Sequence, residues 1–392
     1  MKFVLFYHSL VSDWNHGNAH FLRGVASELV ARGHRVDVYE PENAWSRKNL
    51  IADQGEAACE DVARVYPELS SSFYTLDTLD LDRALDGADG AIVHEWNDPE
   101  LIKRVGEHAR YSRCRVFFHD THHRSVTDAR AMQALDLKHY SGVLAFGRTI
   151  ADEYIKNGWT RLAWVWHEAA DTRRFRPLET REPAGDLVWI GNWGDDERTA
   201  ELQEFLIDPV RDLRLKARIH GVRYPERALA ALDAAGIEYG GWIANYCAPE
   251  AFARYRMTVH VPRRAYADTL VGVPTIRMFE ALACGIPLVS APWHDSEHLF
   301  RPGEDYLVAQ NGKQMREYMQ AILSDPALAA SLARHGLETI ETRHTCRHRV
   351  DELLRIVEGL NASRDRIAQL DRSLSPTMRS SAFSAGVRQG AA

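Results

Sequence analysis

Residues Lys2–Tyr39 read KFVLFYHSLVSDWNHGNAHFLRGVASELVARGHRVDVY, and this stretch decides the class of fold. The apolar run Lys2–Ser9 has the length of a strand, whereas from Ala19 the apolar residues recur every three or four positions, as on one face of a helix. Gly33 stands where the residue after a helix end belongs, and His34–Tyr39 resumes the alternation of a strand. A strand, a helix and a second strand in this order are typical of a parallel sheet.

The alternation of strand-length apolar runs with helical periodicity continues along the chain and starts again near its middle. Further strands of the first half are expected at Gly90–His94, Arg115–His119 and Gly142–Phe146. After Pro183, strands are expected at Leu187–Gly191, Leu215–Gly221, Met257–Val261 and Pro287–Ser290. The stretch Trp166–Pro183 between the two series is polar and contains prolines, as interdomain linkers do. We therefore predict an α/β protein with two Rossmann-like, doubly wound domains.

The composition fits a globular chain and disfavours several partners. The 392 residues carry a formal net charge of −7, so we expect neither nucleic acid nor an anionic membrane as a partner. The five cysteines are scattered without a C-x-x-C pair, which argues against a disulfide framework or a zinc site and fits a reducing compartment. His8 and Ser9 interrupt the first apolar run, and no stretch approaches the ~20 apolar residues of a membrane span. We expect a cytoplasmic protein.

The segment Val273–Val289, VPTIRMFEALACGIPLV, carries the clearest sign of a binding site. Pro274 is placed at the start of a helix and Gly285 just past its end, so free N–H groups near Thr275 are expected to attract an anion such as a diphosphate. Glu280 lies inside an otherwise apolar helix, where a carboxylate is costly unless it accepts strong hydrogen bonds. Sugar or ribose hydroxyls would supply those bonds; a solvated or capping glutamate is the alternative.

This segment resembles the donor-binding signature of the group 1 (family four) glycosyltransferases, which usually has two glutamates in the pattern E-x(7)-E. Glu280 matches the second glutamate, which holds the ribose of the nucleotide in that family, whereas the first falls on Gly272. The departure resembles the CgeB-like branch, whose pattern R-x-F-E-A-x-A-C-G matches Arg277 through Gly285.

Other segments of the second half share the resemblance. Leu187–Arg198, LVWIGNWGDDER, is similar to the branch's strand–G-N–x–R segment. There Gly191 and Asn192 would let the backbone approach the donor, and Arg198 would neutralise the diphosphate; a surface charge is the alternative for this arginine. Trp242 falls in a stretch similar to the family loop beside the nucleotide base, with core packing as its alternative. Further matches are Phe300–Glu304 and His344–Arg349.

The first half resembles the family more loosely. Gly17 and Asn18, together with Arg263 of the second half, are candidates for contacts with the acceptor or a phosphate. His94 and His119 match histidines at the ends of two strands, and the resemblance places His119 beside the donor sugar as a catalytic residue. Strand-end histidines that bind backbone carbonyls are the alternative. Asp120, His122 and His123 join His119 in a set with suitable atoms for a metal, but without a known ligand spacing, so we expect no metal.

The resemblance implies the GT-B architecture, in which two domains face a cleft and a C-terminal helix crosses back to the first domain. The expected boundaries are an acceptor domain at 1–165, a linker at 166–183, a nucleotide-sugar donor domain at 184–345, the crossover helix at 346–360 and a Ser/Arg/Gly-rich tail at 361–392. In the tail we expect one short helix near Arg364–Leu370.

The implied reaction moves a sugar from a UDP-, GDP- or dTDP-sugar to a hydroxyl of a carbohydrate, a lipid-linked glycan or another acceptor. Retention of the anomeric configuration, without a cofactor or metal, is expected, and Arg198, Arg277 and the N–H groups near Thr275 would stabilise the leaving diphosphate. Three alternatives stay open: an inverting transferase with Glu95 or Asp120 as general base, a nucleotide-sugar 2-epimerase, and a non-catalytic sugar-nucleotide-binding protein. A dehydrogenase is disfavoured, because no G-x-G-x-x-G opens either half.

Overall fold

The computed structural model of the chain describes residues 1–179, 182–194 and 196–373. Met1–Val350 forms one compact unit, and a second unit begins at Asp351. The first unit contains two parallel sheets, which confirms the predicted pair of doubly wound domains.

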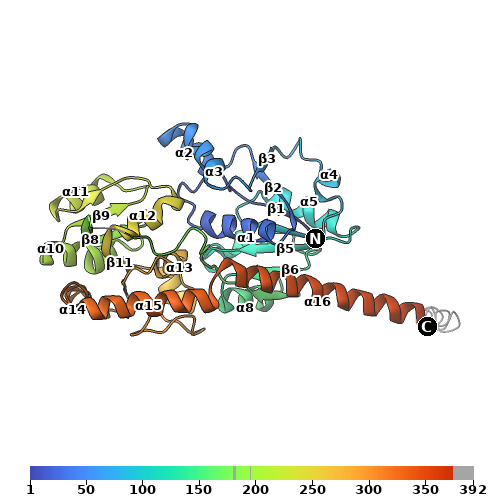
Figure 1. The fold of residues 1–392 in the computed structure, drawn as a ribbon. Coiled ribbons are helices and arrows are strands. Elements are labelled where there is room, and N and C mark those ends of the chain that lie inside the picture. The colour runs from blue at the N-terminus through green and yellow to red at the C-terminus, as the bar shows by residue number, and fades with distance from the viewer. Residues whose placement is uncertain (180–181, 195, 374–392) are drawn as a thin grey trace. The chain divides into compact units, whose positions relative to one another are not determined.

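The first sheet has seven strands in the order β3-β2-β1-β4-β5-β6-β7 (Figure 1). The strands are β1 (Lys2–Phe6), β2 (Arg35–Pro41), β3 (Ser71–Tyr74), β4 (Gly90–His94), β5 (Arg115–Asp120), β6 (Gly142–Ala145) and β7 (Ala163–Val165). The helices between them are α1 (Ala19–Ala31), α2 (Trp45–Gln54), α3 (Ala57–Val65), α4 (Leu81–Leu85), α5 (Pro99–Ala109), α6 (Arg124–Thr127), α7 (Ala129–Gln133) and α8 (Arg148–Lys156).

The second sheet has six strands in the order β10-β9-β8-β11-β12-β13 (Figure 1). The strands are β8 (Gly185–Ile190), β9 (Ala217–His220), β10 (Glu238–Tyr239), β11 (Tyr255–His260), β12 (Leu288–Ser290) and β13 (Leu307–Val308). The α-helices are α9 (Thr199–Leu202), α10 (Asp208–Leu213), α11 (Glu226–Ala234), α12 (Ala248–Ala253), α13 (Ile276–Ala283), α14 (Gly312–Ser324) and α15 (Pro326–Arg343). Single turns of π- and 3₁₀-helix lie at Gln203–Ile207, Asn245–Cys247 and Ala265–Thr269.

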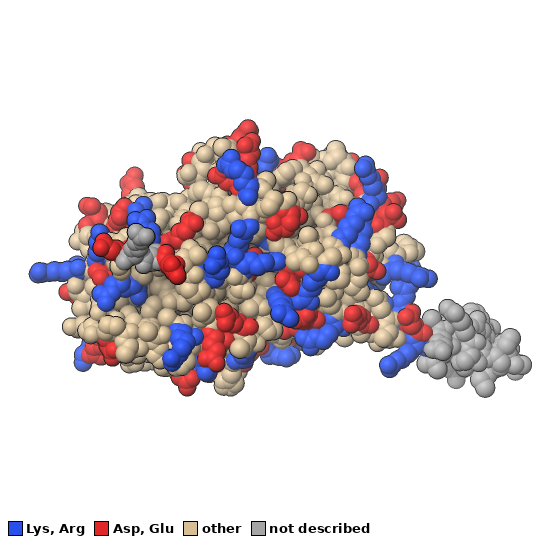
Figure 2. All heavy atoms as spheres, in the orientation of Figure 1, with Lys and Arg blue, Asp and Glu red and all other residues tan. Residues whose placement is uncertain are grey.

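The strand order reverses between β1 and β4 and again between β8 and β11. In open α/β sheets such a reversal opens a crevice at the carboxyl ends of the strands, where ligands bind. The central strands are apolar throughout because helices cover both faces of the sheet: Phe3 through Phe6 of β1 are fully buried. Figure 2 shows acidic and basic side chains intermixed over the visible face.

The predicted strands are found, with ends that differ from the predicted ones by up to three residues in either direction. The predictions missed β3, β7, β10 and β13, which have only two to four residues each and are too short to show an alternating pattern. Pro274 does not begin its helix: Thr275 has an extended backbone with ψ of 157°, so α13 starts at Ile276. Gly285 follows the helix with φ of +65°, as predicted.

The last helix, α16, spans Cys346–Ser373. Its first turn is tied to the linker, because Cys346 N–H donates to Ala170 O (2.9 Å) and Trp166 Nε1 donates to Arg349 O (2.8 Å). Arg32 of α1 also donates to Arg347 O (3.1 Å). That the rest of the helix crosses the first domain stays a prediction.

The helix continues past the expected end at residue 360, so the separate short helix expected near Arg364–Leu370 is part of α16. Nothing between Asn361 and Ser363 stops it, since none of these residues is proline or glycine. The tail from residue 374 lies outside the described residues. Within the part of the chain that is described, no helix combines the length and the apolar character needed to cross a membrane.

Candidate functional site

A cavity of about 510 Å³ lies at the carboxyl ends of both sheets; we call it the central cavity. Its walls come from the loops after β1 and β5 in the first domain and after β8 and β11 in the second, and from the start of α13. Eight of the predicted site residues line it: Gly17, Asn18, Gly191, Asn192, Arg198, Arg263, Thr275 and Arg277. The predicted residues His94, His119, Trp242 and Glu280 do not.

Arg198 is the most deeply placed cation of the central cavity. Its guanidinium donates to Val261 O (2.7 Å) and to Asn192 O, and it lies over the Trp189 ring at 5.5 Å. Burial lowers its pKa to about 10, so the group is still charged at neutral pH. Within the described residues its Nε has no hydrogen-bond partner. A positive charge held by backbone carbonyls is suited to an anionic ligand.

The start of α13 adds backbone N–H groups to the same wall. Thr275, Ile276 and Arg277 line the cavity, and the Thr275 hydroxyl is fixed at 3.1 Å from His260 Nε2. A helix N-terminus stabilises negative charge through its free N–H groups and its dipole. Arg263 completes the basic wall, with Nε donating to Glu197 Oε1 (2.7 Å).

The glycine-asparagine pair after β8 brings backbone to the cavity surface. A Cβ at Gly221 would lie 2.1 Å from Gly191 O, so these two segments touch through their backbones. Asn192 accepts from Val222 N–H (2.9 Å) and donates to Asn15 Oδ1 (2.5 Å) of the first domain. The cavity surface is therefore joined across the two domains.

Glu280 lies behind this wall, fully buried. Its carboxylate accepts from His20 Nδ1 (3.0 Å) and Asn245 Nδ2 (2.7 Å) and pairs with Arg277. His20 Nε2 accepts the N–H of Asp171 (2.8 Å), which leaves the ring proton on Nδ1, facing Glu280. Burial alone would raise the pKa of Glu280, but Arg277 and His20 hold it below its usual value. The expectation that Glu280 faces the cleft is not met, because protein donors take its lone pairs.

The second half of the chain matches a known family in sequence. Residues 198–355 match the family described as "Glycosyl transferase-like". A comparison with curated proteins gives no match.

The fold of the chain is similar to that of several solved structures over nearly its whole length. Sucrose-phosphate synthase from Thermosynechococcus elongatus is 14% identical, with a TM-score of 0.62, covering 93% of this chain and 100% of that one. Anabaena HepE in complex with UDP and glucose is 14% identical, with a TM-score of 0.65, covering 92% and 100%. An α-glucosyltransferase in complex with UDP and a 13-mer DNA is 12% identical, with a TM-score of 0.66, covering 91% and 99%.

The fold is GT-B. At these identities the likeness shows architecture alone, and the CgeB-like branch within the group stays a prediction.

Gly272 stands where the E-x(7)-E pattern of the group 1 glycosyltransferases has its first glutamate. Its φ is +86°, and a Cβ there would approach Ser296 Oγ to 2.3 Å. A side chain at this position would therefore hold the backbone in a strained conformation, and the Ser296 hydroxyl would have to move. Nearby, Glu297 accepts from Arg148 N–H (2.7 Å) and lies 3.0 Å from His167 Nε2, so its carboxylate joins the second domain to the first.

The two histidines predicted as catalytic are buried below the central cavity. The His119 ring packs 4.9 Å from Trp166 and 5.9 Å from Phe21, and neither of its nitrogens has a hydrogen-bond partner among the described residues. Burial lowers its pKa to about 3, so it is neutral. His94 Nε2 lies 3.0 Å from Thr121 Oγ1, rather than bonding a carbonyl as the alternative supposed.

The residues that reach the cavity are the next ones along, Thr121, His122 and His123. β5 ends at Asp120, so His119 is still within the strand and packs inside the domain, whereas the loop that follows lines the cavity. His122 and His123 have ring centroids 3.8 Å apart. Among the residues that the structure describes, no three His, Cys, Asp or Glu side chains form a group that would hold a metal.

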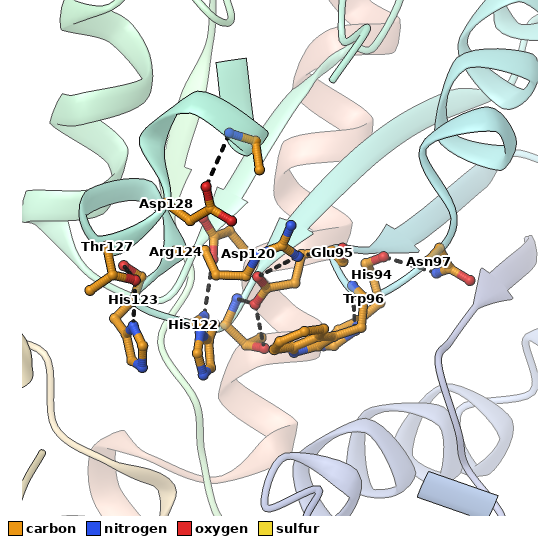
Figure 3. Close-up of polar contacts among 12 residues, drawn as sticks. His94, Glu95, Trp96, Asn97, Asp120, His122, His123, Arg124, Thr127 and Asp128 are labelled. Atoms are coloured by element: carbon orange, nitrogen blue, oxygen red, sulfur yellow. Dashed lines mark hydrogen bonds and ion pairs between the residues drawn. The ribbon is translucent and has the colours of Figure 1, made fainter. Parts of the chain in front are cut away.

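The carboxyl groups considered as general bases hold this loop in place (Figure 3). Asp120 accepts from His122 N–H (3.0 Å) and from the Tyr154 hydroxyl (2.8 Å), and Glu95 accepts from Thr121 N–H (2.9 Å). Both are fully buried, which raises the pKa of Asp120 to about 6 and that of Glu95 well above its usual value. Neither carboxyl group lines the central cavity. They act on it indirectly, because they hold the loop of Thr121 and His122 that does line it.

Other residues of the site differ from expectation. Trp242 is half-buried and lies outside the lining of the central cavity. Conversely, Trp45, Trp96, Arg223 and Tyr266 line the cavity and were missed. Trp96 follows the end of β4 by two residues, and Trp45 begins α2 four residues after the end of β2; no sequence motif marks either position.

Proposed function

We propose that the chain is a glycosyltransferase that moves a sugar from a nucleotide-sugar donor to an acceptor hydroxyl. The observation that carries the proposal is the basic wall of the central cavity, where Arg198, Arg263 and Arg277 meet the N-terminus of α13. UDP is bound by two of the structural neighbours, which supports a nucleoside diphosphate as the anion.

In the proposed reaction, negative charge develops on the diphosphate as its bond to the anomeric carbon breaks. Arg198, Arg277 and the N–H groups after Thr275 stabilise this charge in a site that is already organised, which lowers the barrier without a metal or cofactor. Gly191 and Asn192 bring backbone to the phosphates. The two domains exclude water that would otherwise hydrolyse the donor.

We infer that the reaction retains the anomeric configuration. An inverting enzyme needs a general base at the acceptor hydroxyl. The two carboxyl groups considered for that role, Glu95 and Asp120, are buried and bound to backbone N–H groups, which supports the retaining alternative. Glu280 is buried behind the basic wall and bound by His20, Asn245 and Arg277, so we assign it no contact with the donor and propose that it positions Arg277.

The test begins with thermal shifts of the full chain in UDP, GDP and dTDP and their sugar conjugates, because stabilisation reports binding. A donor labelled in its sugar is then incubated with a glycan mixture, and the products and their anomeric configuration are analysed. A labelled oligosaccharide with free nucleoside diphosphate is expected, and added EDTA should not change its yield. An epimerised sugar without a new glycosidic bond would establish the epimerase, and donor binding without any product the non-catalytic protein.

A further inference from the structure

A second cavity, of about 590 Å³, lies at the carboxyl end of the first sheet; we call it the N-domain cavity. It is lined by the segments that follow β1, β2, β3 and β4, which is the ligand-binding edge of a parallel sheet. Trp45 and Trp96 line both this cavity and the central cavity. The two cavities thus share a wall made of two indole rings.

These two rings belong to a row of aromatic side chains that leads from one cavity to the other. The Trp45 ring packs against the His8 ring, with their centroids 4.9 Å apart and an interplanar angle of 31°. Trp96 is 6.3 Å from Trp45 and 5.1 Å from His122, and it carries the Arg124 guanidinium 4.9 Å from its centre (Figure 3). Both tryptophans are half-buried, so each is held by its neighbours while part of its ring remains accessible. A fixed, accessible indole face suits the C–H face of a sugar ring.

The polar rim of the N-domain cavity is acidic on balance. Glu42, Asn43, Thr75 and Asp98 are exposed around it, with Lys48 as its one lysine or arginine among the lining residues described. Carboxylates and amides accept hydrogen bonds from hydroxyl groups. A phosphodiester or a diphosphate would instead meet two carboxylates, which repel it. This rim contrasts with the central cavity, whose wall contains Arg198, Arg263 and Arg277.

We propose that the N-domain cavity binds a neutral glycan, which is the acceptor, with a sugar ring stacked on Trp45 or Trp96. The assignment rests on the proposed transfer reaction, in which the reacting hydroxyl reaches past Trp96 into the central cavity. Its oxygen bonds to the anomeric carbon of the donor sugar as the bond from that carbon to the diphosphate oxygen breaks. The hydroxyl proton goes to the departing diphosphate, and nothing is oxidised or reduced.

The test uses the full chain on an array of neutral glycans, acidic glycans and single-stranded DNA, alongside three variants. Glu42→Lys reverses a charge on the rim, Trp45→Ala removes a stacking face, and Glu107→Lys makes the same charge change on an exposed position of α5 that lines neither cavity. We expect a neutral oligosaccharide to bind and the first two variants to weaken it about tenfold, as loss of a stacking or charged contact typically does. Glu107→Lys should bind it like the unchanged chain.

Calorimetry with UDP separates this proposal from the proposed function. Glu42 lines only the N-domain cavity, so Glu42→Lys should keep its UDP affinity, which also shows that the variant folds. Three results would overturn the glycan assignment. The chain could prefer acidic glycans or DNA, or it could bind UDP but no neutral glycan. The third is that Glu42→Lys and Glu107→Lys bind the glycan with the same affinity. Failure of the unchanged chain to bind any nucleotide would defeat the proposed function instead, while a neutral glycan lost in Glu42→Lys would still locate a glycan site.

Discussion

The two cavities share the wall of Trp45 and Trp96 but offer opposite chemistry. The central cavity gathers guanidinium groups and backbone N–H groups, whereas the N-domain cavity offers aromatic faces with carboxylate and amide side chains. In the proposed reaction the first stabilises the charge of the diphosphate and the second holds the hydroxyl groups of the acceptor. A reaction that separates a diphosphate from a sugar and joins that sugar to a hydroxyl requires both environments side by side.

The difference extends to how the two walls are held. Arg198 is fixed by two backbone carbonyls, and Thr275 by His260, so the charge-stabilising groups keep their positions without a ligand. The rim residues Glu42 and Asn43 are exposed on a loop. Groups that act on a transition state gain most from being organised in advance, whereas loops adapt to different partners.

The largest effect is expected from Arg198→Ala. A charged hydrogen-bonding group contributes about 1.5–3 kcal/mol, so UDP affinity should fall about 10- to 100-fold. Uridine has no phosphate, and its affinity should change little. Calorimetry with both ligands checks this, with Arg264→Ala as a control, since Arg264 pairs with Glu201 and does not line the central cavity. Equal losses for UDP and uridine would mean that Arg198 does not contact phosphate.

Gly272→Glu tests whether the first family glutamate can be restored. The left-handed backbone and the approach to Ser296 should destabilise the fold by about 1–3 kcal/mol, which is a fall in Tm of several degrees, without gain in turnover. Gly359→Glu is the control, because a Cβ at Gly359 would have no neighbouring atom within 4 Å. Gly312→Glu would not serve, because Gly312 is buried against Glu204. An unchanged Tm together with faster turnover in Gly272→Glu would show that the loop rearranges around a new sugar contact.

The basic wall could be predicted from sequence because its geometry is local. The start of α13 and the turn after β8 are each set by a short run of residues, so Thr275, Arg277, Gly191 and Asn192 could be assigned from their own segments to the cavity that they line, whereas their contact with a donor stays a prediction. The alternation of strands and helices, and its restart after Pro183, also follow from local periodicity. The N-domain cavity, by contrast, is assembled from four strand ends far apart in the chain.

Local sequence patterns could not predict which side chains pair with one another in the folded chain. The sequence shows that Glu280 needs hydrogen-bond donors, but one of them, His20, is 260 residues away. His119 is the next-to-last residue of β5, and one residue of difference in where a strand ends decides whether a side chain packs in the core or faces the cavity. The linker contact between Cys346 and Ala170 likewise depends on tertiary packing.

His119→Phe is expected to have a small effect on turnover. The ring is neutral, buried among aromatic groups and without a hydrogen-bond partner among the described residues, so an apolar ring of similar shape should fit. Removing buried unpaired nitrogens is neutral or stabilising, and we expect an equal or higher Tm with kcat within about threefold of the unchanged chain. His122→Ala, at the cavity surface, should lower kcat more. A loss of two orders of magnitude in His119→Phe at unchanged Tm would return His119 to the mechanism.

The smallest effect concerns the pH dependence of stability set by the buried pair Asp120 and Glu95. The folded-state pKa of Asp120 is raised to about 6, above its unfolded value, so the folded chain binds more protons between these two pKa values. The stability contributed by this group is therefore greatest at low pH and falls as pH rises from about 4 to about 6.

Asp120→Asn cannot ionise and should show a flatter change in the free energy of unfolding over that range. Its amide oxygen can still accept from His122 N–H, which keeps the loop in place. Urea denaturation of both proteins at several pH values gives the difference in slope, which reports the Asp120–Glu95 pair because Asp120 also raises the pKa of Glu95. A slope that is the same in both would mean that Asp120 is already ionised throughout, and that the proton of the pair resides on Glu95.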